Sequence, residues 1–368
     1  TGVGLYNFTA VYEGSFRPKE SGAYELLIEG DDGYRVYVNG EKVIDYWGEH
    51  ASAKRDYTLK ATAGTDYKIR IEYMQAGAEA LLRFDLGIYR HISPEMVVDR
   101  VKEADIVIFA GGISPSLEGE EMYSVNSPGF AGGDRTSIEL PQVQRDILKA
   151  LKKAGKKVVF VNCSGSAVAL VPEMESCDAI LQAWYPGQSG GLAVADVLFG
   201  DFNPSGKLPV TFYKNTDQLP DFEDYSMKNR TYRYMTEVPL FPFGYGLSYT
   251  TFDISKGRLN KKTISAGQDL NFKVNVKNTG KYDGAEVIQV YVRKVDDAEG
   301  PIKSLRAFRR VPLKAGETCV VSIDLLPTTF EFFDPTTNTM RIMPGKYEIM
   351  YGNSSDIPSG NKLSVTLR

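Results

Sequence analysis

The sequence has few of the residues that metal sites and Ser-His catalysis most often use. Its 368 residues include two histidines, His50 and His91, which lie far apart in the chain. They are a poor supply for a His-based metal site or a Ser-His triad. The three cysteines have no zinc spacing, and their odd number argues against a disulfide framework. We expect free thiols, with Cys163 buried in the apolar strand KVVFVNC, and we expect neither a metal nor a cofactor.

Long apolar runs and strongly basic segments are also missing. No run is long enough to cross a bilayer, and no signal peptide opens the sequence, which begins at Thr1 instead of a methionine. We therefore expect the numbering to start after processing or partway through a longer polypeptide. The net charge is −4, with acidic and basic residues interspersed, which argues against nucleic acid or an anionic membrane as a partner. The length predicts about two to three domains.

Residues 1–90 are predicted to be all-β, because short runs of branched and aromatic residues alternate there with turn residues. The predicted strands are Tyr24–Gly30, Gly33–Val38, Lys42–Asp45, Tyr67–Tyr73 and Ala80–Leu86. Asn39-Gly40, between two of them, is typical of a two-residue hairpin turn. The stretch YELLIEGDDGYRVYVNGEKVID resembles the protective-antigen-type β-domain, a β-sandwich module of many carbohydrate-active and adhesive proteins.

Two features of this first domain are candidates for ligand binding. Asp31 and Asp32 are a candidate calcium pair, because hard cations prefer clustered carboxylates, although two acids beside a glycine more commonly form a turn with solvated charges. Tyr46 and Trp47 fall in a loop after a strand, with His50 close by in sequence. They are candidate substrate-binding residues, since an aromatic side chain there would rim a sugar site, and a plain packing role is equally open.

Residues 91–252 show strands that alternate with helices, which predicts a mainly parallel sheet covered on both faces. The predicted helices are Pro94–Ala104, Pro141–Ala154, Ala169–Met174 and Gly191–Phe199, and the predicted strands are Asp105–Ala110, Lys157–Asn162, Ala179–Trp184 and Leu208–Phe212. Ser137 or a neighbour is expected to cap the second helix, with Pro141 in its first turn. Few strands are clear for a free-standing domain of this kind. We expect the first part of the sheet to come from residues that precede Thr1, with the first β-domain inserted into the sheet domain.

Residues 253–368 are again predicted to be all-β. Apolar residues recur there with period two between turn residues. The predicted strands are Leu270–Asn278, Ala285–Arg293, Cys319–Leu325 and Gly345–Tyr351. The pattern is typical of a β-sandwich of the immunoglobulin or fibronectin type III kind. It contains no catalytic constellation, and we interpret it as a packing and stabilising module.

The connection after strand Asp105–Ala110 is the most informative segment of the chain. It forms a loop of about twenty residues, far longer than an ordinary strand-to-helix connection. It carries Glu118, Glu120 and Glu121 and then a Gly-Gly-Asp-Arg turn at 132–135. Long loops at the carboxyl ends of strands in α/β sheets are where ligands bind and chemistry happens. This loop is therefore the candidate active-site segment.

Elimination leaves carboxylate chemistry as the candidate mechanism. Gly111-Gly112 is not a dinucleotide fingerprint, the turn at 132–135 is not a P-loop, and Gly165-Ser166-Ala167 lacks the nucleophile-elbow pattern. A Glu on a long loop works as a general acid and base if partial burial raises its pKa. A solvated acidic loop remains the alternative, since the second carboxylate that glycoside hydrolysis needs has no obvious motif in this sequence.

Several long motifs, in the right order, resemble glycoside hydrolase family 3, in the carboxyl-terminal part of its β-glucosidases and β-xylosidases. They are GGISPSLEGEEM, GGDRTSIELPQVQ, NCSGSAVAL, QAWYPGQSGGLAVADVLFGDFNPSGKLPVTF, PLFPFGYGLSYTTF and PIKSLRAFRRVPLKAGE. The resemblance implies a retaining exo-glycosidase, secreted or periplasmic, that acts on oligosaccharides from plant polysaccharides. It implies an amino-terminal barrel domain that supplies an Asp nucleophile, and this barrel is absent from the chain. It also implies that residues 91–252 form an α/β-sandwich domain that supplies the acid/base.

The family's acid/base Glu precedes an Asp-Arg pair. Matched on the Gly-Glu pair, it falls on Glu120, with Glu118 and Glu121 as fallbacks. Asp134 and Arg135 are interpreted as structuring the loop, through a turn acid and a guanidinium that pins the loop by bidentate contacts. The motif wording favours the xylosidase branch. A noncatalytic carbohydrate-binding protein and a structural partner subunit are the alternatives.

Overall fold

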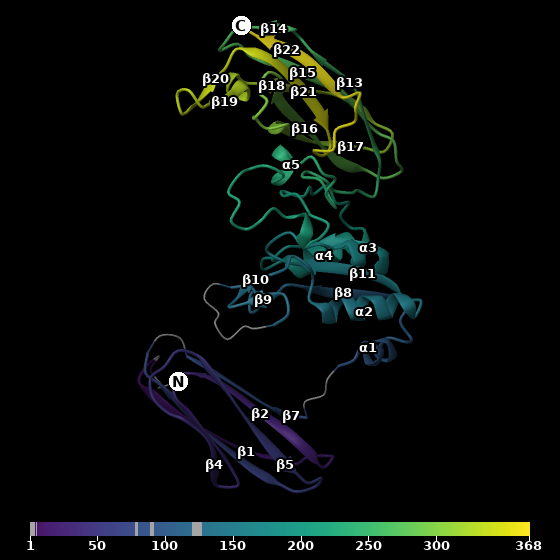
Figure 1. Cartoon of the computed structure of the whole chain (residues 1–368). Helices are drawn as coiled ribbons and strands as arrows, with labels where there is room; N and C mark the ends of the chain where they lie inside the picture. The colour runs from purple at the N-terminus through teal and green to yellow at the C-terminus, as the bar shows by residue number, and fades with distance from the viewer. Residues whose placement is uncertain (1–3, 5, 78–79, 89–91, 120–126) are drawn as a thin grey trace. The chain divides into compact units, whose positions relative to one another are not determined.

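The computed structural model of the chain describes residue 4 and residues 6–77, 80–88, 92–119 and 127–368. The chain folds into two compact units, Thr1–Ile92 and Ser93–Arg368 (Figure 1). The second unit holds both the α/β part and the carboxyl-terminal β part. The finer division into three domains at 90 and 252 stays a prediction.

The first unit consists of two antiparallel sheets, in the orders β1-β6-β3-β4 and β5-β2-β7. The strands are β1 (Phe8–Phe16), β2 (Gly22–Asp31), β3 (Tyr34–Val38), β4 (Glu41–Tyr46), β5 (Ala53–Ala61), β6 (Tyr67–Gln75) and β7 (Leu81–Gly87). Alternate residues of each sheet point into one core, which includes Leu26 and Ile28 from one sheet and Tyr34 and Val36 from the other. All five predicted strands are present in this unit. The Asn39-Gly40 hairpin is confirmed, with both residues at positive φ.

The α/β part of the second unit contains a three-stranded parallel sheet in the order β12-β11-β8. Its elements are α1 (Pro94–Arg100), β8 (Ile106–Gly112), β9 (Phe130–Ala131), β10 (Asp134–Arg135), α2 (Gln142–Lys153), β11 (Lys157–Cys163), α3 (Val171–Ser176), β12 (Ala179–Gln182), α4 (Gly190–Phe199), η1 (Thr216–Gln218) and α5 (Thr231–Tyr234). Buried Leu148 and Leu151 of α2 pack in one core with Val158 and Phe160 of β11. Strand and helix order follow the prediction closely.

Two local predictions in this part are wrong. Leu208–Phe212 forms no strand but a single bridge, between Phe212 and Phe241. Pro209 lies within that run, and proline cannot donate a ladder hydrogen bond. Ser137 does not cap α2, whose N-cap position is Pro141 with no side-chain cap.

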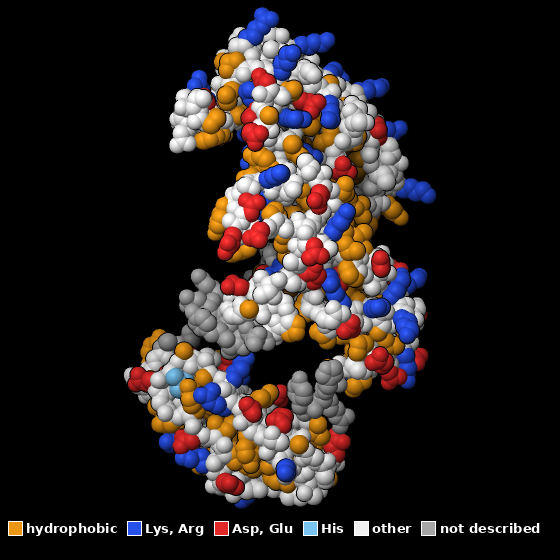
Figure 2. Space-filling view, in the orientation of Figure 1, with side chains coloured by type: hydrophobic (Ala, Val, Ile, Leu, Met, Phe, Trp, Pro, Cys, Tyr) orange, Lys and Arg blue, Asp and Glu red, His pale blue; other side chains and the backbone are white. Residues whose placement is uncertain are grey.

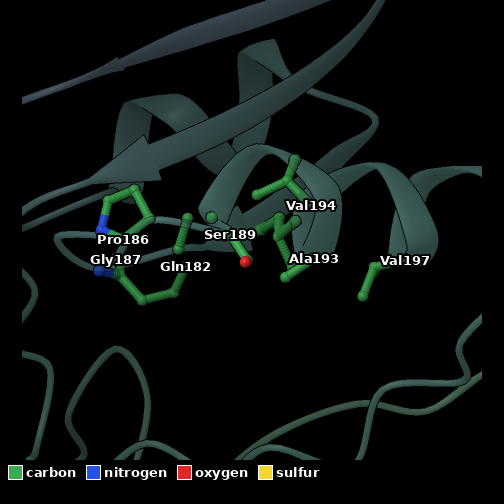
Figure 3. A pocket seen from close by; sticks show the side chains of 10 residues that line it. Gln182, Pro186, Gly187, Ser189, Ala193, Val194 and Val197 are labelled. Atoms are coloured by element: carbon green, nitrogen blue, oxygen red, sulfur yellow. The ribbon is translucent and has the colours of Figure 1, made fainter.

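One face of β8 remains uncovered. Ile106 and Ile108 are 57% and 52% exposed, while the alternate residues Val107 and Phe109 pack against the core. Helix α4 likewise has no buried side chain, although its composition is apolar. An open groove of about 450 Å³ lies between α4 and the end of β12. Gln182, Pro186 and residues of α4 such as Val194 line it (Figure 3). Parallel sheets normally have both faces covered.

The carboxyl-terminal β part has two main sheets, in the orders β13-β15-β18 and β14-β22-β21-β16-β17, and a small β19-β20 hairpin. Its elements are β13 (Phe252–Leu259), β14 (Thr263–Ile264), β15 (Leu270–Asn278), β16 (Gly284–Lys294), β17 (Ser304–Leu313), β18 (Thr318–Leu325), η2 (Pro327–Phe330), β19 (Glu331–Asp334), β20 (Thr339–Ile342), β21 (Gly345–Gly352) and β22 (Lys362–Leu367). Residues from both sheets, such as Phe272 of β15 and Ile349 of β21, share one hydrophobic core.

A buried ion pair joins this β part to the α/β part. Lys207 Nζ lies 2.7 Å from Glu286 Oε1, and the two side chains are 12% and 6% exposed. Glu286 Oε2 also accepts a 2.9 Å hydrogen bond from Asn353. Nearby, Gln289 of β16 donates to the carbonyl of Gly244 over 3.0 Å. These contacts explain why residues 93–368 behave as one compact unit.

Candidate functional site

The candidate loop leaves β8 at a backbone position that only glycine fits. Gly112 has φ +127°, and a Cβ added there would lie 1.9 Å from the carbonyl oxygen of Cys163 on β11. The side-chain amide of Gln144 on α2 fixes the same residue. It donates to the Gly112 carbonyl over 2.7 Å and accepts from the Gly112 N–H over 2.9 Å. Strand, neighbouring strand and helix therefore fix the point at which the loop begins.

The outgoing arm of the loop is fixed over its first residues. The Ile113 N–H donates to the Cys163 carbonyl over 2.9 Å, and the Tyr185 hydroxyl donates to the Ile113 carbonyl over 2.9 Å. A turn follows, in which the Glu118 N–H donates to the Ser114 carbonyl over 3.1 Å. Because its start is hydrogen-bonded on both sides, the loop leaves the sheet in a defined direction.

The returning arm is a short hairpin of β9 and β10. Gly132 and Gly133 form its two-residue turn with φ of +61° and +90°, values that favour glycine. The N–H of Gly119 donates to the Gly133 carbonyl over 3.2 Å. The outgoing and returning arms therefore meet at this turn. The Gly-Gly-Asp-Arg motif therefore forms the turn and the second strand of this hairpin.

The Arg135 guanidinium contacts the sheet domain from the returning arm. Nη1 donates to Ser166 Oγ over 2.7 Å and to the Ala167 carbonyl over 3.2 Å, and Nε donates to the Ser137 carbonyl over 3.2 Å. The side chain is 10% exposed. Burial lowers the pKa of the guanidinium, and the negative charge of Glu118 opposes that effect. Nη2 is buried without a hydrogen-bond partner among the residues described.

The three candidate glutamates are treated differently by the structure. Glu120 and Glu121 lie outside the described residues. The Glu118 carboxylate lies 3.8 Å from Arg135 Nη1, and it accepts a 3.3 Å hydrogen bond from Ser166 Oγ. Its side chain is 26% exposed. Glu118 is therefore positioned to brace the loop against the turn that follows β11. Asp134, the other half of the motif, is exposed.

Glu139, just after the hairpin, is a residue that sequence reasoning missed. Its carboxylate accepts hydrogen bonds from Ser137 Oγ and Thr216 Oγ1, each at 2.5 Å, and from the Thr216 N–H at 2.9 Å. Burial disfavours the charged form, but these bonds outweigh it and lower the pKa of Glu139 to about 2. An acid this strong stays ionised near neutral pH. It therefore anchors the segment instead of donating protons.

Other contacts of the site were also missed, namely those of Gln144, Ser166 and Tyr185. These residues lie on α2, after β11 and after β12, and they meet the loop because the parallel register brings the carboxyl ends of β8, β11 and β12 to one edge. Ser166 and Tyr185 lie in the family-like motifs NCSGSAVAL and QAWYPGQSGG. Nothing in the spacing assigned the contacts.

The candidate residues of the first unit form an aromatic and cationic cluster. The ring centroids of Tyr46 and His50 are 4.1 Å apart, and the guanidinium carbon of Arg55 lies 3.9 Å from the Tyr46 centroid. Trp47 is 38% exposed, and the guanidinium carbon of Arg35 lies 4.4 Å from its ring centroid. Tyr46 is thus packed, while Trp47 keeps part of its surface open. A substrate-binding role for either residue stays a prediction.

The expectation of solvated charges at the acidic pair is wrong for Asp32, which is 6% exposed. Its carboxylate accepts the backbone N–H groups of His50 at 3.0 Å and Ala76 at 2.7 Å. Burial opposes ionisation, but these amides prevail and hold the pKa of Asp32 below its usual range. No cluster of three or more metal-binding side chains occurs in the described part of the chain.

The cysteines are free thiols, but only Cys177 is buried; Cys163 and Cys319 are half-buried, so the expected burial of Cys163 is wrong. Cys163 is the last residue of β11, and its carbonyl accepts the N–H of Ile113 at the start of the loop. None of the helices described is long and apolar enough to span a bilayer.

Comparison with known proteins places the chain in a family of glycosyl hydrolases. A family model described as the glycosyl hydrolase family 3 C-terminal domain matches residues 32–249, and a fibronectin type III-like domain model matches residues 286–355. The chain is 52% identical over 366 residues to the xylan 1,4-beta-xylosidase of Xylanibacter ruminicola, covering 99% of this chain and 42% of that protein. It is 38% identical over 280 residues to the periplasmic beta-glucosidase of Salmonella typhimurium, covering 72% and 35%.

A solved structure agrees with this result. The crystal structure of the beta-glucosidase from Kluyveromyces marxianus in complex with glucose matches with a TM-score of 0.76 and 28% identity, over 98% of this chain and 44% of that chain. The chain belongs to glycosyl hydrolase family 3, as its motifs indicated. It spans less than half the length of these relatives. The multidomain composition, with the family's C-terminal domain and a fibronectin type III-like domain, is confirmed.

Proposed function

We propose that this chain is the carboxyl-terminal part of a retaining, exo-acting β-glycosidase and supplies its acid/base glutamate. The observation that carries the proposal is the loop after β8. Its two arms are fixed at the carboxyl edge of a parallel sheet by Gln144, Tyr185 and Arg135, which hold both ends of an acidic segment in place. A catalytic group on a loop needs such anchoring, because small displacements of the reacting groups cost large factors in rate.

Glu120 is the proposed acid/base. As an acid it protonates the glycosidic oxygen and makes the leaving group less basic; as a base it later takes a proton from the water that releases the glycosyl-enzyme. The contacts of Glu118 support this choice, because its carboxylate is engaged with Ser166 and lies near Arg135. Glu118 thus braces the loop. Glu121 remains the alternative acid.

The nucleophile is proposed to be an Asp on an amino-terminal barrel domain of the same enzyme. Retention requires the two carboxyl groups to approach to about 5–5.5 Å, so the loop must reach a sugar held by that domain. The exposed apolar face of β8, with Ile106 and Ile108, supports the idea that further chain packs on this sheet and completes an α/β sandwich. In the same scheme, residues 253–368 form a fibronectin type III-like sandwich that packs and stabilises.

The substrates are proposed to be oligosaccharides from plant polysaccharides, with terminal nonreducing β-D-xylose favoured over β-D-glucose. The 52% identity to a protein named xylan 1,4-beta-xylosidase supports xylose. A secreted or periplasmic location is proposed with it, supported by the periplasmic relative.

The test compares Glu120→Gln with Glu118→Gln and Glu121→Gln, in the chain joined to the part of the xylosidase relative that it does not match. Glu120→Gln should lower turnover of an alkyl β-xyloside by about 10²- to 10⁴-fold, because its leaving group needs protonation. Formation of the glycosyl-enzyme from dinitrophenyl β-xyloside should be nearly unchanged, and azide should restore its breakdown. The same pattern in Glu121→Gln would move the role to that residue. If all three variants keep full turnover, the chain is a noncatalytic binding or structural partner.

A further inference from the structure

The segment that leads into α5 exposes two aromatic rings almost completely. Phe222 and Tyr225 are 91% and 90% exposed, the largest values among the exposed large hydrophobic side chains of the described residues. In Figure 1 this segment projects from the second unit beside α5, and Figure 2 shows hydrophobic and acidic side chains together at that place. Burial of one aromatic side chain is worth about 1.5–3 kcal/mol, so two fully exposed rings suggest a binding role.

The backbone that carries the rings is held in one conformation. The Asp224 N–H donates to the Asp221 carbonyl over 3.1 Å and closes a turn around Phe222. Arg230 then binds three backbone carbonyls of the segment. Its Nη2 donates to the carbonyls of Asp221 (3.0 Å) and Asp224, and its Nε donates to the Ser226 carbonyl over 3.1 Å. Phe222 and Tyr225 are therefore presented by a braced turn, which lowers the entropy lost when a ligand binds.

Acidic side chains lie between and beside the rings in the sequence Asp-Phe-Glu-Asp-Tyr. Asp221 and Asp224 each use Oδ1 to accept a backbone N–H, at 2.8 Å in both cases. Glu223, between them, is exposed. Aromatic faces that alternate with carboxylates suit a ligand that is apolar on its C–H faces and rich in hydroxyl donors at its edges. A sugar ring has both properties.

We propose that Phe222 and Tyr225 form a binding platform for a β-linked polysaccharide of the xylan class. The rings stack on the C–H faces of successive sugar residues, and neighbouring carboxylates accept hydroxyl hydrogen bonds. This proposal rests on the proposed function, because the choice of a β-linked xylan follows from it. It adds a polymer-holding surface on the second unit to the loop that carries the acid.

The charge pattern disfavours a protein partner at this surface. Cores of protein–protein interfaces are depleted of Asp and Glu, because desolvating a carboxylate is costly unless it is paired. Here the five-residue stretch that carries both rings, 221–225, also contains three acids, Asp221, Glu223 and Asp224. A hydrated carbohydrate leaves such carboxylates in contact with water and hydroxyl groups. The polysaccharide is therefore the occupant that the chemistry favours.

The test is native affinity electrophoresis of the whole chain in gels with soluble β-1,4-xylan, with dextran, or with no polymer. Xylan alone should retard the wild-type chain. Phe222→Ala and Tyr225→Ala should each weaken the apparent affinity by about fivefold or more, the effect expected for one lost ring contact, and the double variant should migrate as if no xylan were present. The matched controls, Phe308→Ala and Tyr282→Ala, remove rings that are 69% and 63% exposed elsewhere on the unit, and they should bind as the wild type does.

Three results would overturn the proposal. They are no retardation of the wild type, equal retardation by dextran, and unchanged retardation of the double variant. Loss of self-association in the double variant without any xylan binding would instead assign the rings to a protein interface. Thermal unfolding of each variant checks that the fold is intact. Binding needs no turnover, so failure here leaves the acid/base test unaffected, and failure of that test leaves the gel result interpretable.

Discussion

Arg135 Nη1 donates to Ser166 Oγ over 2.7 Å, and this bond joins the returning arm of the loop to the turn after β11. The same hydroxyl donates to the Glu118 carboxylate on the outgoing arm over 3.3 Å. One serine therefore links both arms of the loop. Since the two arms enclose the acidic segment, their separation is set by residues of the sheet domain.

Replacement of Arg135 by Met should loosen this link. The variant leaves the carbonyls of Ser137 and Ala167 without their donor and removes the charge facing Glu118. We expect a loss of about 2–4 kcal/mol in the free energy of unfolding of the second unit, measured by urea denaturation. The control, Lys152→Met, removes an exposed ion pair with Asp178 and should cost less than about 1 kcal/mol. Equal losses in both variants would contradict a structural role for the guanidinium.

Gly112→Ala should be among the most damaging substitutions of a small residue in this chain. The added Cβ would lie 1.9 Å from the backbone oxygen of Cys163 on β11, and a backbone atom cannot move aside as the end of a flexible side chain can. In addition, a φ of +127° is strained for alanine. We expect the folded yield to fall severely, or the second unit to lose about 3 kcal/mol or more. The matched control is Gly191→Ala in α4, where a Cβ meets nothing within 4 Å. There the change should be neutral or stabilising by about 0.5–1 kcal/mol, so a tolerated Gly112→Ala would refute the close approach.

The pH dependence of stability should report on Glu139. Its pKa is about 2 in the folded chain against 4.5 for an ordinary glutamate, so its contribution is complete above pH 4.5 and lost as the pH falls towards 2. The full effect should be about 1–3 kcal/mol. Glu139→Gln should therefore be less stable than wild type at pH 6 and nearly equal to it at pH 2. Parallel stability curves for the two proteins across this range would show that Glu139 is not the cause.

The buried pair of Lys207 and Glu286 should behave as a coupled unit. Removing only the lysine leaves a 6% exposed carboxylate without its cation, and Lys207→Met should cost about 3–5 kcal/mol. The double variant Lys207→Met/Glu286→Gln should recover a large part of that loss. A double-mutant cycle by urea denaturation measures the coupling. Additive losses from the single changes would mean that the pair does not join the two parts.

The strands that the sequence predicts correctly are those in which apolar residues recur at every second position and are buried on one face of the sheet. Strands such as β2 and β15 bury alternate residues, so their sequences show the period directly. Strands β1, β5 and β17 were missed because most of their side chains are exposed or half-buried and many are polar. Neighbouring strands decide their conformation, and a local pattern does not contain that information.

The candidate site was predictable as a segment and not as a set of contacts. Loop length, the Gly-Gly turn and the arginine are local features, and they located the loop. The partners Ser166, Tyr185 and Gln144 lie 31 to 72 residues along the chain from the loop residues that they bind. Only the pairing of the strands in the sheet brings them together. Glu139 was missed for a similar reason, because Thr216, which donates two hydrogen bonds to it, is 77 residues away.

The central claim is that this chain carries one half of a glycosidase site. The most direct measurement is the turnover of nitrophenyl β-xyloside by the chain alone, by the part of the xylosidase relative that this chain does not match, and by the two together. The account predicts no turnover above background for the chain alone and turnover when the two are combined, with loss of that turnover in Glu120→Gln. Robust hydrolysis by this chain without any barrel segment would contradict it.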